Sequence, residues 1–121
     1  MSFSKRAQEL KEHVRASAYR CALHNPTARS SALHPSCGDE VVFSVRVHEG
    51  VIVEIGVLGE GCLLSQAAAV LAAQYVHNKL VTEVAGLSDD LLISLLNIGH
   101  VGPTRRQCIS LVTQALKQLF S

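Results

Sequence analysis

The sequence predicts an α+β domain in which a small antiparallel β-sheet of about three strands packs against four to five helices. Two segments rich in β-branched residues, 40–47 and 51–58, follow each other with only a short turn between them. The alanine-rich segment 62–76 is apolar on nearly every side, which is typical of a central, buried helix. Amphipathic segments at 3–20 and 105–120 indicate further helices that cover the sheet.

The composition is that of one domain spanning residues 1–121. The chain is 48% hydrophobic, and it shows no repeat, low-complexity stretch or linker. Only 4% of the residues are aromatic and none is Trp, which argues against a base-stacking or sugar-binding face. A net charge of +1 provides no overall field for nucleic acid or an anionic membrane. We therefore expect neither of these partners.

The N-terminus and the cysteines indicate where the protein works. Residues 1–6 are not followed by an apolar signal-peptide core, and no apolar run approaches the roughly 18 residues that span a bilayer. We therefore expect a cytoplasmic protein. In that reducing compartment the four cysteines favour metal or sulfur chemistry, or buried thiols, over disulfides.

The first half of the chain predicts one helix and the sheet. Apolar residues recur at helical spacing over 3–20, and Asn25-Pro26 is expected to end that helix. Residues 27–36 have the composition of a loop. Because two strands alone make an unstable sheet, a third strand is expected within 27–34. His48-Glu49-Gly50 is expected to form the hairpin turn between the other two strands.

The second half predicts helices with recognisable ends. Residues 81–87 are weakly helical, and Ser88 with the two aspartates after it opens a further helix that Gly99 is expected to close. Before the last helix, Thr104 and Gln107 match the spacing of a capping box.

Three cysteines are expected at the ends of elements. Cys37 precedes the first β-branched strand, Cys62 opens the buried helix and Cys108 lies near the start of the last helix. Element ends can meet at one pole of an α+β domain, where helix N-termini favour the thiolates that metals and sulfur donors need. Asp39 follows Cys37 on a tight turn and offers a carboxylate ligand. Spacing alone leaves three unrelated buried thiols as an alternative, and Cys21 is expected to be a packing residue or an incidental surface thiol.

An ordered set of short motifs is more specific than any single cysteine. The set covers roughly residues 20–120 and consists of Asn25-Pro26, Cys37-Gly38-Asp39, a β-hairpin, Gly61-Cys62 before a small-residue helix, and Gly102-Pro103 before Cys108. In this order the motifs resemble the NifU/IscU/SufU-type iron–sulfur cluster assembly scaffolds. The resemblance implies a SufE/NifU-like fold and an assembly scaffold rather than a turnover enzyme.

The resemblance also implies a site and a set of partners. Cys37, Cys62 and Cys108 match the three cysteines of the family, and Asp39 matches the aspartate of its Cys-Gly-Asp motif. These residues would accept sulfur from a cysteine desulfurase, build a transient [2Fe–2S] cluster for apo-protein acceptors, or hold Zn²⁺. An Hsp70-type chaperone is a further implied partner. One carboxylate among three thiolates suits a site that must release what it assembles.

The chain departs from the pattern of the family in two places. The IscU branch has a His directly before its third Cys, where this chain has Gln107. The IscU branch also has a Leu-Pro-Pro-Val-Lys segment that a chaperone reads, and Val101–Arg105 of this chain keeps only part of it. His34 and His100 are candidates to replace the missing imidazole. The absent His and the run Gly59-Glu60-Gly61-Cys62 resemble the SufU branch, in which zinc and sulfur relay are prominent, although that branch has a longer insertion between its second and third cysteines.

Other functions stand beside the cluster scaffold. One is a SufU-like zinc-containing protein that relays persulfide sulfur, and another is a structural zinc-binding interaction domain. A third is a hydrolase with Cys62 as nucleophile and a base such as His100, for which the sequence specifies no orienting group. Arg105 and Arg106 are candidates to lower the pKa of Cys108 or to attract an acidic partner, and phosphate-binding or plain surface roles fit them equally.

Overall fold

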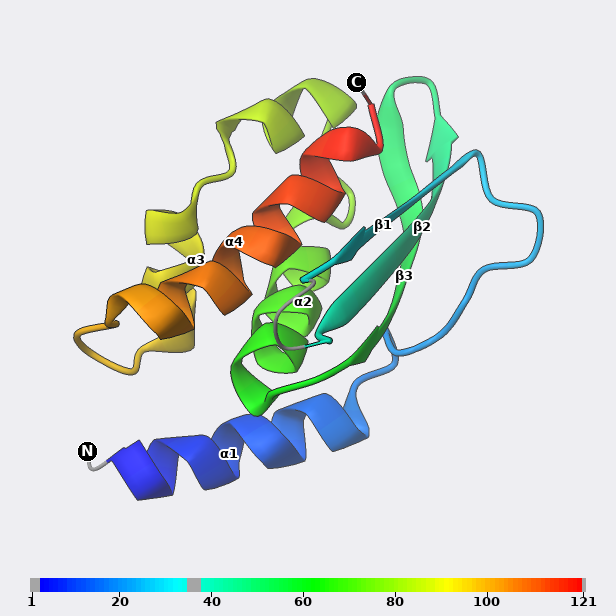
Figure 1. The fold of residues 1–121 in the computed structure, drawn as a ribbon. Helices are drawn as coiled ribbons and strands as arrows, with labels where there is room; N and C mark the ends of the chain where they lie inside the picture. The colour runs from blue at the N-terminus through cyan, green and yellow to red at the C-terminus, as the bar shows by residue number, and fades with distance from the viewer. Residues whose placement is uncertain (1–2, 35–37, 121) are drawn as a thin grey trace.

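The computed structural model describes residues 3–34 and 38–120, so Cys37 lies outside the described residues. In chain order the elements are α1 (Phe3–Ala16), β1 (Ala28–Leu33), β2 (Glu40–His48), β3 (Val51–Glu60), α2 (Leu63–Val76), the 3₁₀ helix η1 (Val81–Gly86), α3 (Asp89–Leu96) and α4 (Pro103–Gln118). One three-stranded sheet packs against helices (Figure 1). The predicted α+β fold class is therefore confirmed.

The sheet has the strand order β1-β2-β3, with both pairs antiparallel. Glu49 and Gly50 form the predicted hairpin turn, and both adopt left-handed backbone angles, with φ values of 52° and 78°. β1 falls within the range predicted for the third strand. The loop-like composition of this segment was misleading, because β2 supplies hydrogen-bond partners that local sequence cannot reveal.

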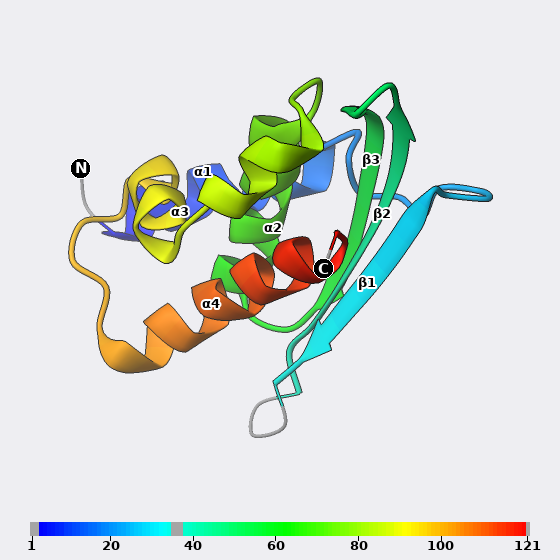
Figure 2. The same cartoon turned by 90° about the horizontal axis from the view of Figure 1, so that it is seen from above.

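The core lies between one face of the sheet and helices α2 and α4 (Figure 2). α2 packs mainly on β3, whereas α4 packs on β1 and β2. Ala68 and Ala72 of α2 are fully buried, which confirms that this helix is central and that its small residues allow close approach. Ser30 Oγ of β1 donates a hydrogen bond to the carbonyl oxygen of Ala115 in α4, so a buried polar contact also ties strand to helix.

The N-terminal helix is shorter than predicted. α1 ends at Ala16, well before Asn25-Pro26, and the chain then passes along β3 and over the outer face of the sheet. The Tyr19 carbonyl accepts a hydrogen bond from Val57 N at 2.8 Å. Gly56 lacks the Cβ that would collide with the backbone of Cys21 at this crossing. Contacts with the sheet thus outweigh the helical periodicity of residues 17–20.

The smaller elements largely follow the predictions. Residues 81–87 are helical as η1, and Ser88 caps α3 because its Oγ accepts a hydrogen bond from Leu91 N at 3.2 Å. α3 ends at Leu96 because Asn97 takes the left-handed conformation, so Gly99 is not the residue that closes it. No helix in the two described ranges is long and apolar enough to cross a bilayer.

Replacing Tyr19 by Phe is expected to lower the free energy of unfolding by about 1 kcal/mol, the usual net value of one hydrogen bond. The Tyr19 hydroxyl lies 2.8 Å from His77 Nδ1, and His77 Nε2 lies 3.1 Å from the Val53 carbonyl oxygen. Since that carbonyl can only accept, Nε2 carries the proton and the hydroxyl donates to Nδ1. Urea denaturation measures the loss. Tyr75→Phe is the matched control, expected to stay within about 0.5 kcal/mol, because Tyr75 is exposed.

Candidate metal and thiol site

The structure brings together three of the four predicted ligands. The ligand atoms of Asp39, Cys62 and Cys108 all lie within 4.8 Å of one another. Asp39 precedes β2, Cys62 is the N-cap residue of α2, and Cys108 lies in the second turn of α4. Three separate segments therefore supply one cluster of soft and hard donors, the kind of set that binds a transition metal.

The Asp39 carboxylate is buried, with only 3% of the residue exposed. Its Oδ1 accepts a hydrogen bond from Cys62 N at 3.3 Å, whereas Oδ2 has no hydrogen-bond partner in the described part of the chain. The backbone holds the residue in place, because His34 N donates to the Asp39 carbonyl oxygen at 2.8 Å. A buried carboxylate oxygen without a partner is costly unless a cation meets it. This oxygen therefore marks a place for a positive ligand.

Gly61 makes room for that carboxylate. Its φ of 130° is rarely adopted by residues with side chains, and a Cβ at this position would collide with the Asp39 carboxylate. In the sequence, Gly61-Cys62 is recognisable only as part of a motif. The structure supplies the physical reason, since the residue before Cys62 must leave space for Asp39.

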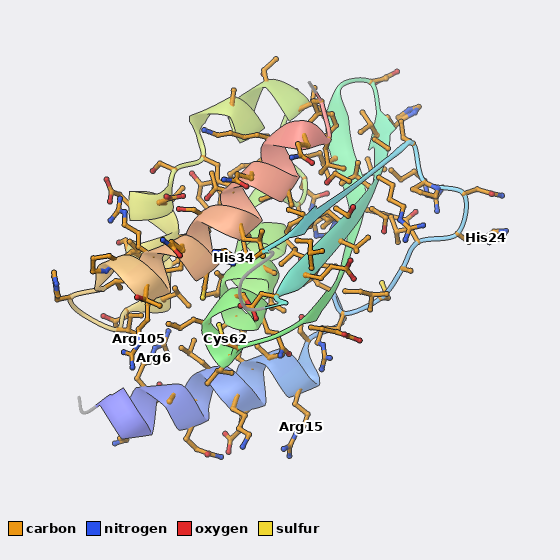
Figure 3. The ribbon with its side chains drawn as sticks, viewed as in Figure 1. Arg6, Arg15, His24, His34, Cys62 and Arg105 are labelled. Carbon is orange, nitrogen blue, oxygen red and sulfur yellow. The ribbon has the colours of Figure 1, made fainter. Side chains whose placement is uncertain are left out.

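Cys62 presents an accessible thiol where α2 begins (Figure 3). Its Sγ lies 3.7 Å from Ser65 Oγ, and the Ser65 hydroxyl donates to the Cys62 carbonyl oxygen at 3.0 Å. Ser65 is buried, so it holds the first turn of the helix around the thiol. None of the sequence motifs includes this serine, although its position three residues after a helix N-cap was a usable signal.

Cys108 is the partly buried thiol of the cluster, and its Sγ lies 3.8 Å from the Thr104 carbonyl oxygen. Burial, followed by the hydrogen bond and charge of Cys62 and then the charge and hydrogen bond of Asp39, raises the pKa of Cys108 to about 12. The predicted lowering of this pKa by Arg105 and Arg106 is therefore wrong. Arg106 pairs instead with Asp90, its Nη2 lying 2.8 Å from Asp90 Oδ1.

Gln107 does not act in a capping box. The N-cap of α4 is Gly102 with Pro103 at the first helical position, so Thr104 already lies inside the helix. Gln107 Oε1 instead lies 3.3 Å from His34 Nε2, which joins the end of β1 to α4. Among the described residues, neither His34 nor His100 belongs to the three-residue cluster.

The fold and the cluster define a class of protein: an α+β domain that presents thiols and a carboxylate together at the start of a buried helix. Residues 9–120 match the model of the NifU-like N terminal domain family. The chain belongs to this family, which confirms the resemblance found in its sequence.

Relatives and solved structures agree with this assignment. Over 84 residues the chain is 26% identical to the iron–sulfur cluster assembly scaffold protein IscU of Thermotoga maritima. That match spans 69% of the chain and 59% of the relative, which is less than two thirds of the relative's length.

Two crystal structures share the fold at low sequence identity. A scaffold protein for iron–sulfur cluster assembly by the SUF system of Fervidobacterium islandicum has a TM-score of 0.76 at 19% identity, and the match covers 93% of each chain. The N-terminal part of a NifU-like protein of Brucella abortus has a TM-score of 0.72 at 17% identity, covering 98% of this chain and 94% of that one. At these identities the likeness shows the fold alone.

Proposed function

We propose that this chain is an iron–sulfur cluster assembly scaffold and not a turnover enzyme. It accepts sulfur from a cysteine desulfurase, builds a [2Fe–2S] cluster transiently and passes it to apo-protein acceptors. The observation that carries the proposal is the buried Asp39 oxygen, which has no hydrogen-bond partner among the described residues, in a residue that lies beside two thiols. Membership of the NifU-like family supports the same function.

The donor set suits this cargo. Cys62 and Cys108 offer soft sulfur ligands, and Asp39 offers a harder oxygen. Cys37 lies outside the described residues but stands two positions before Asp39 in the sequence, and we propose it as the third thiolate. An oxygen among sulfur ligands gives a weaker bond to iron than a fourth thiolate would, which favours release of the cluster.

Sulfur transfer requires an accessible thiolate. The attacking thiolate would form a new S–S bond to the terminal sulfur of the desulfurase persulfide, and the desulfurase thiolate would leave as that bond breaks. Of the two described thiols at the site, Cys62 is the more exposed. We therefore propose Cys62 as an acceptor before Cys108, with Cys37 as the other candidate.

The proposal extends to compartment and partners. Cys21, Cys62 and Cys108 are free thiols, the state that a reducing cytoplasm maintains, and we place the protein there. An Hsp70-type chaperone is proposed as a partner because Val101–Arg105 keeps part of the segment that such a chaperone reads in the IscU branch. A hydrolase is not favoured, since no histidine joins the cluster around Cys62 in the described residues.

Anaerobic reconstitution tests the function. The protein is incubated with Fe²⁺, cysteine, a cysteine desulfurase and dithiothreitol, which supplies the electrons that reduce persulfide sulfur to sulfide. Visible absorption, iron and sulfide are then measured. We expect a cluster on the wild type and on Cys21→Ala, a matched control because Cys21 is also a free thiol but lies outside the cluster. We expect none on Cys37→Ala, Cys62→Ala or Cys108→Ala. Equal cluster content in all five proteins would contradict the proposal.

The same samples separate the scaffold from the zinc alternatives. A persulfide relay would transfer sulfur while it retained zinc and formed no cluster. A structural zinc domain would unfold when a chelator removed the metal, whereas a scaffold should stay folded and gain reactive thiols. Far-ultraviolet circular dichroism with and without chelator measures this difference.

A further inference from the structure

A shallow groove runs between the end of β1 and one face of α4. Its volume is about 260 Å³, and it is lined by Leu33, His34, Gln107, Ser110, Leu111 and Gln114. The four α4 residues recur at helical spacing, so they form one face of the helix. β1 is the outermost strand of the sheet, and α4 lies alongside it (Figure 2).

The strand that borders the groove has an open edge. His34 N donates to the Asp39 carbonyl oxygen, so the backbone of His34 faces β2. Because facing pairs alternate in an antiparallel ladder, the N–H and C=O groups of Leu33 and Ser31 face the other way. In the described ranges, the sheet has no strand beyond β1. Such an edge readily pairs with an added strand.

The lining of the groove suits an uncharged peptide. Gln107 and Gln114 carry amides that both donate and accept hydrogen bonds, like a peptide backbone. Among the described residues the lining holds no Asp, Glu, Lys or Arg, and the carboxylate of Asp89 is already engaged by the Ser110 hydroxyl, so the groove favours an uncharged segment. Leu33 is 59% exposed and supplies apolar contact at the rim. An edge strand facing a helix is also the arrangement that binds peptides by strand addition in PDZ domains.

One end of the groove adjoins the thiol site. His34 is hydrogen-bonded through its backbone to Asp39, and Gln107 directly precedes Cys108. The side chains of His34 and Gln107 contact each other at 3.3 Å, between the groove and the site. A peptide in the groove would therefore have one end beside Asp39 and Cys108.

We propose that the groove binds an extended, uncharged, cysteine-bearing segment of an acceptor protein. The segment adds as a strand to the open edge of β1 and brings its thiol to the Asp39–Cys108 end of the groove. This inference rests on the proposed function, because it names the kind of partner that receives the cargo.

Peptide titration of the ¹⁵N-labelled full chain tests the proposal by NMR. The probe is the blocked peptide acetyl-Val-Thr-Cys-Thr-Val-amide, and we expect shifts at residues 31–34 of β1 and along the groove face of α4. A control peptide that is N-methylated at all five backbone nitrogens lacks the N–H donors that strand addition requires, whichever alternate residues face β1. It should bind at least about fivefold more weakly, the loss expected from one backbone hydrogen bond.

Two variants test the position of the site. Ser31→Pro removes an N–H that faces away from β2, at an exposed edge position where proline is tolerated. Gln114→Ala removes one of the two side-chain amides that line the groove. Each should weaken peptide binding at least about fivefold. Gln74→Ala is the matched control, because Gln74 is an exposed glutamine outside the groove, and it should bind the peptide like the wild type. If Ser31→Pro fails to fold, Gln114→Ala decides the question.

Two outcomes would overturn the inference. One is equal affinity in Gln114→Ala and Gln74→Ala. The other is concentration-dependent shifts of β1 without peptide, which would show that a second copy of the chain occupies the edge. Metal content is measured on the same variants and should not change. A wild type that binds the peptide in the groove but assembles no cluster would contradict the proposed function and leave the peptide site in place.

Discussion

Replacing Asp39 by Asn is expected to weaken metal binding by at least about a hundredfold. Mutation of residues that only support metal ligands already lowers metal affinity by about 10- to 100-fold, and Asp39 is a candidate ligand itself. The same change should raise the stability of the metal-free protein by about 1 kcal/mol. Asn has the shape of Asp and keeps the oxygen that accepts from Cys62 N. It removes the buried oxygen that has no hydrogen-bond partner within the described part of the chain, and replaces it with an amide that can donate to a nearby sulfur.

Opposite changes in affinity and stability distinguish a ligand from a structural residue. Competition with a chelator measures the metal affinity, and urea unfolding of the metal-free protein measures the stability. Asp90→Asn is the matched control: the Asp90 side chain is 82% exposed and pairs with Arg106, so metal affinity should not change. If Asp39→Asn lowers stability and leaves affinity intact, Asp39 only holds the backbone.

Replacing Gly61 by Ala is expected to lower the free energy of unfolding by about 3 kcal/mol, which combines backbone strain with a steric collision. The added Cβ would meet the Asp39 carboxylate in a backbone conformation that side chains rarely adopt. Relief of the collision must shift either the Asp39 carboxylate or the backbone before Cys62, and either shift changes the spacing of the ligand atoms. Metal content should therefore fall together with stability.

Gly99→Ala separates the two causes. Gly99 also has a positive φ, 79°, but a Cβ there would meet nothing within 4 Å. This variant should cost only about 1 kcal/mol of backbone strain and should keep its metal. Thermal unfolding and metal analysis of both variants make the comparison. Equal losses in the two variants, with metal retained in both, would mean that Asp39 does not depend on Gly61.

Local chemistry explains what could be predicted from the sequence. The hairpin turn at Glu49-Gly50, the buried alanine-rich helix and the Ser88 cap depend on neighbours a few residues apart. The ordered motifs identified the family, and the match over residues 9–120 confirms it. The role of Cys37 as a third ligand stays a prediction, because the structure does not describe that residue.

Tertiary contacts decided the features that sequence patterns missed. α1 ends at Ala16 because the next residues bind along the sheet. Gln107 contacts His34, seventy-three positions away in the chain, and so has no part in a helix cap. Burial and the nearby Cys62 and Asp39 raise the pKa of Cys108, which its local basic neighbours did not indicate.

The sequence by itself determined which elements form and which residue types are available for chemistry, because periodicity, turn residues and motifs act locally. Only the tertiary structure decided that the ligand atoms of Asp39, Cys62 and Cys108 meet within 4.8 Å, and that one buried oxygen of Asp39 finds no hydrogen-bond partner in residues 3–34 and 38–120. Distances between residues far apart in the chain depend on how α2 and α4 pack on the sheet. That packing is a property of the whole core and not of any one segment.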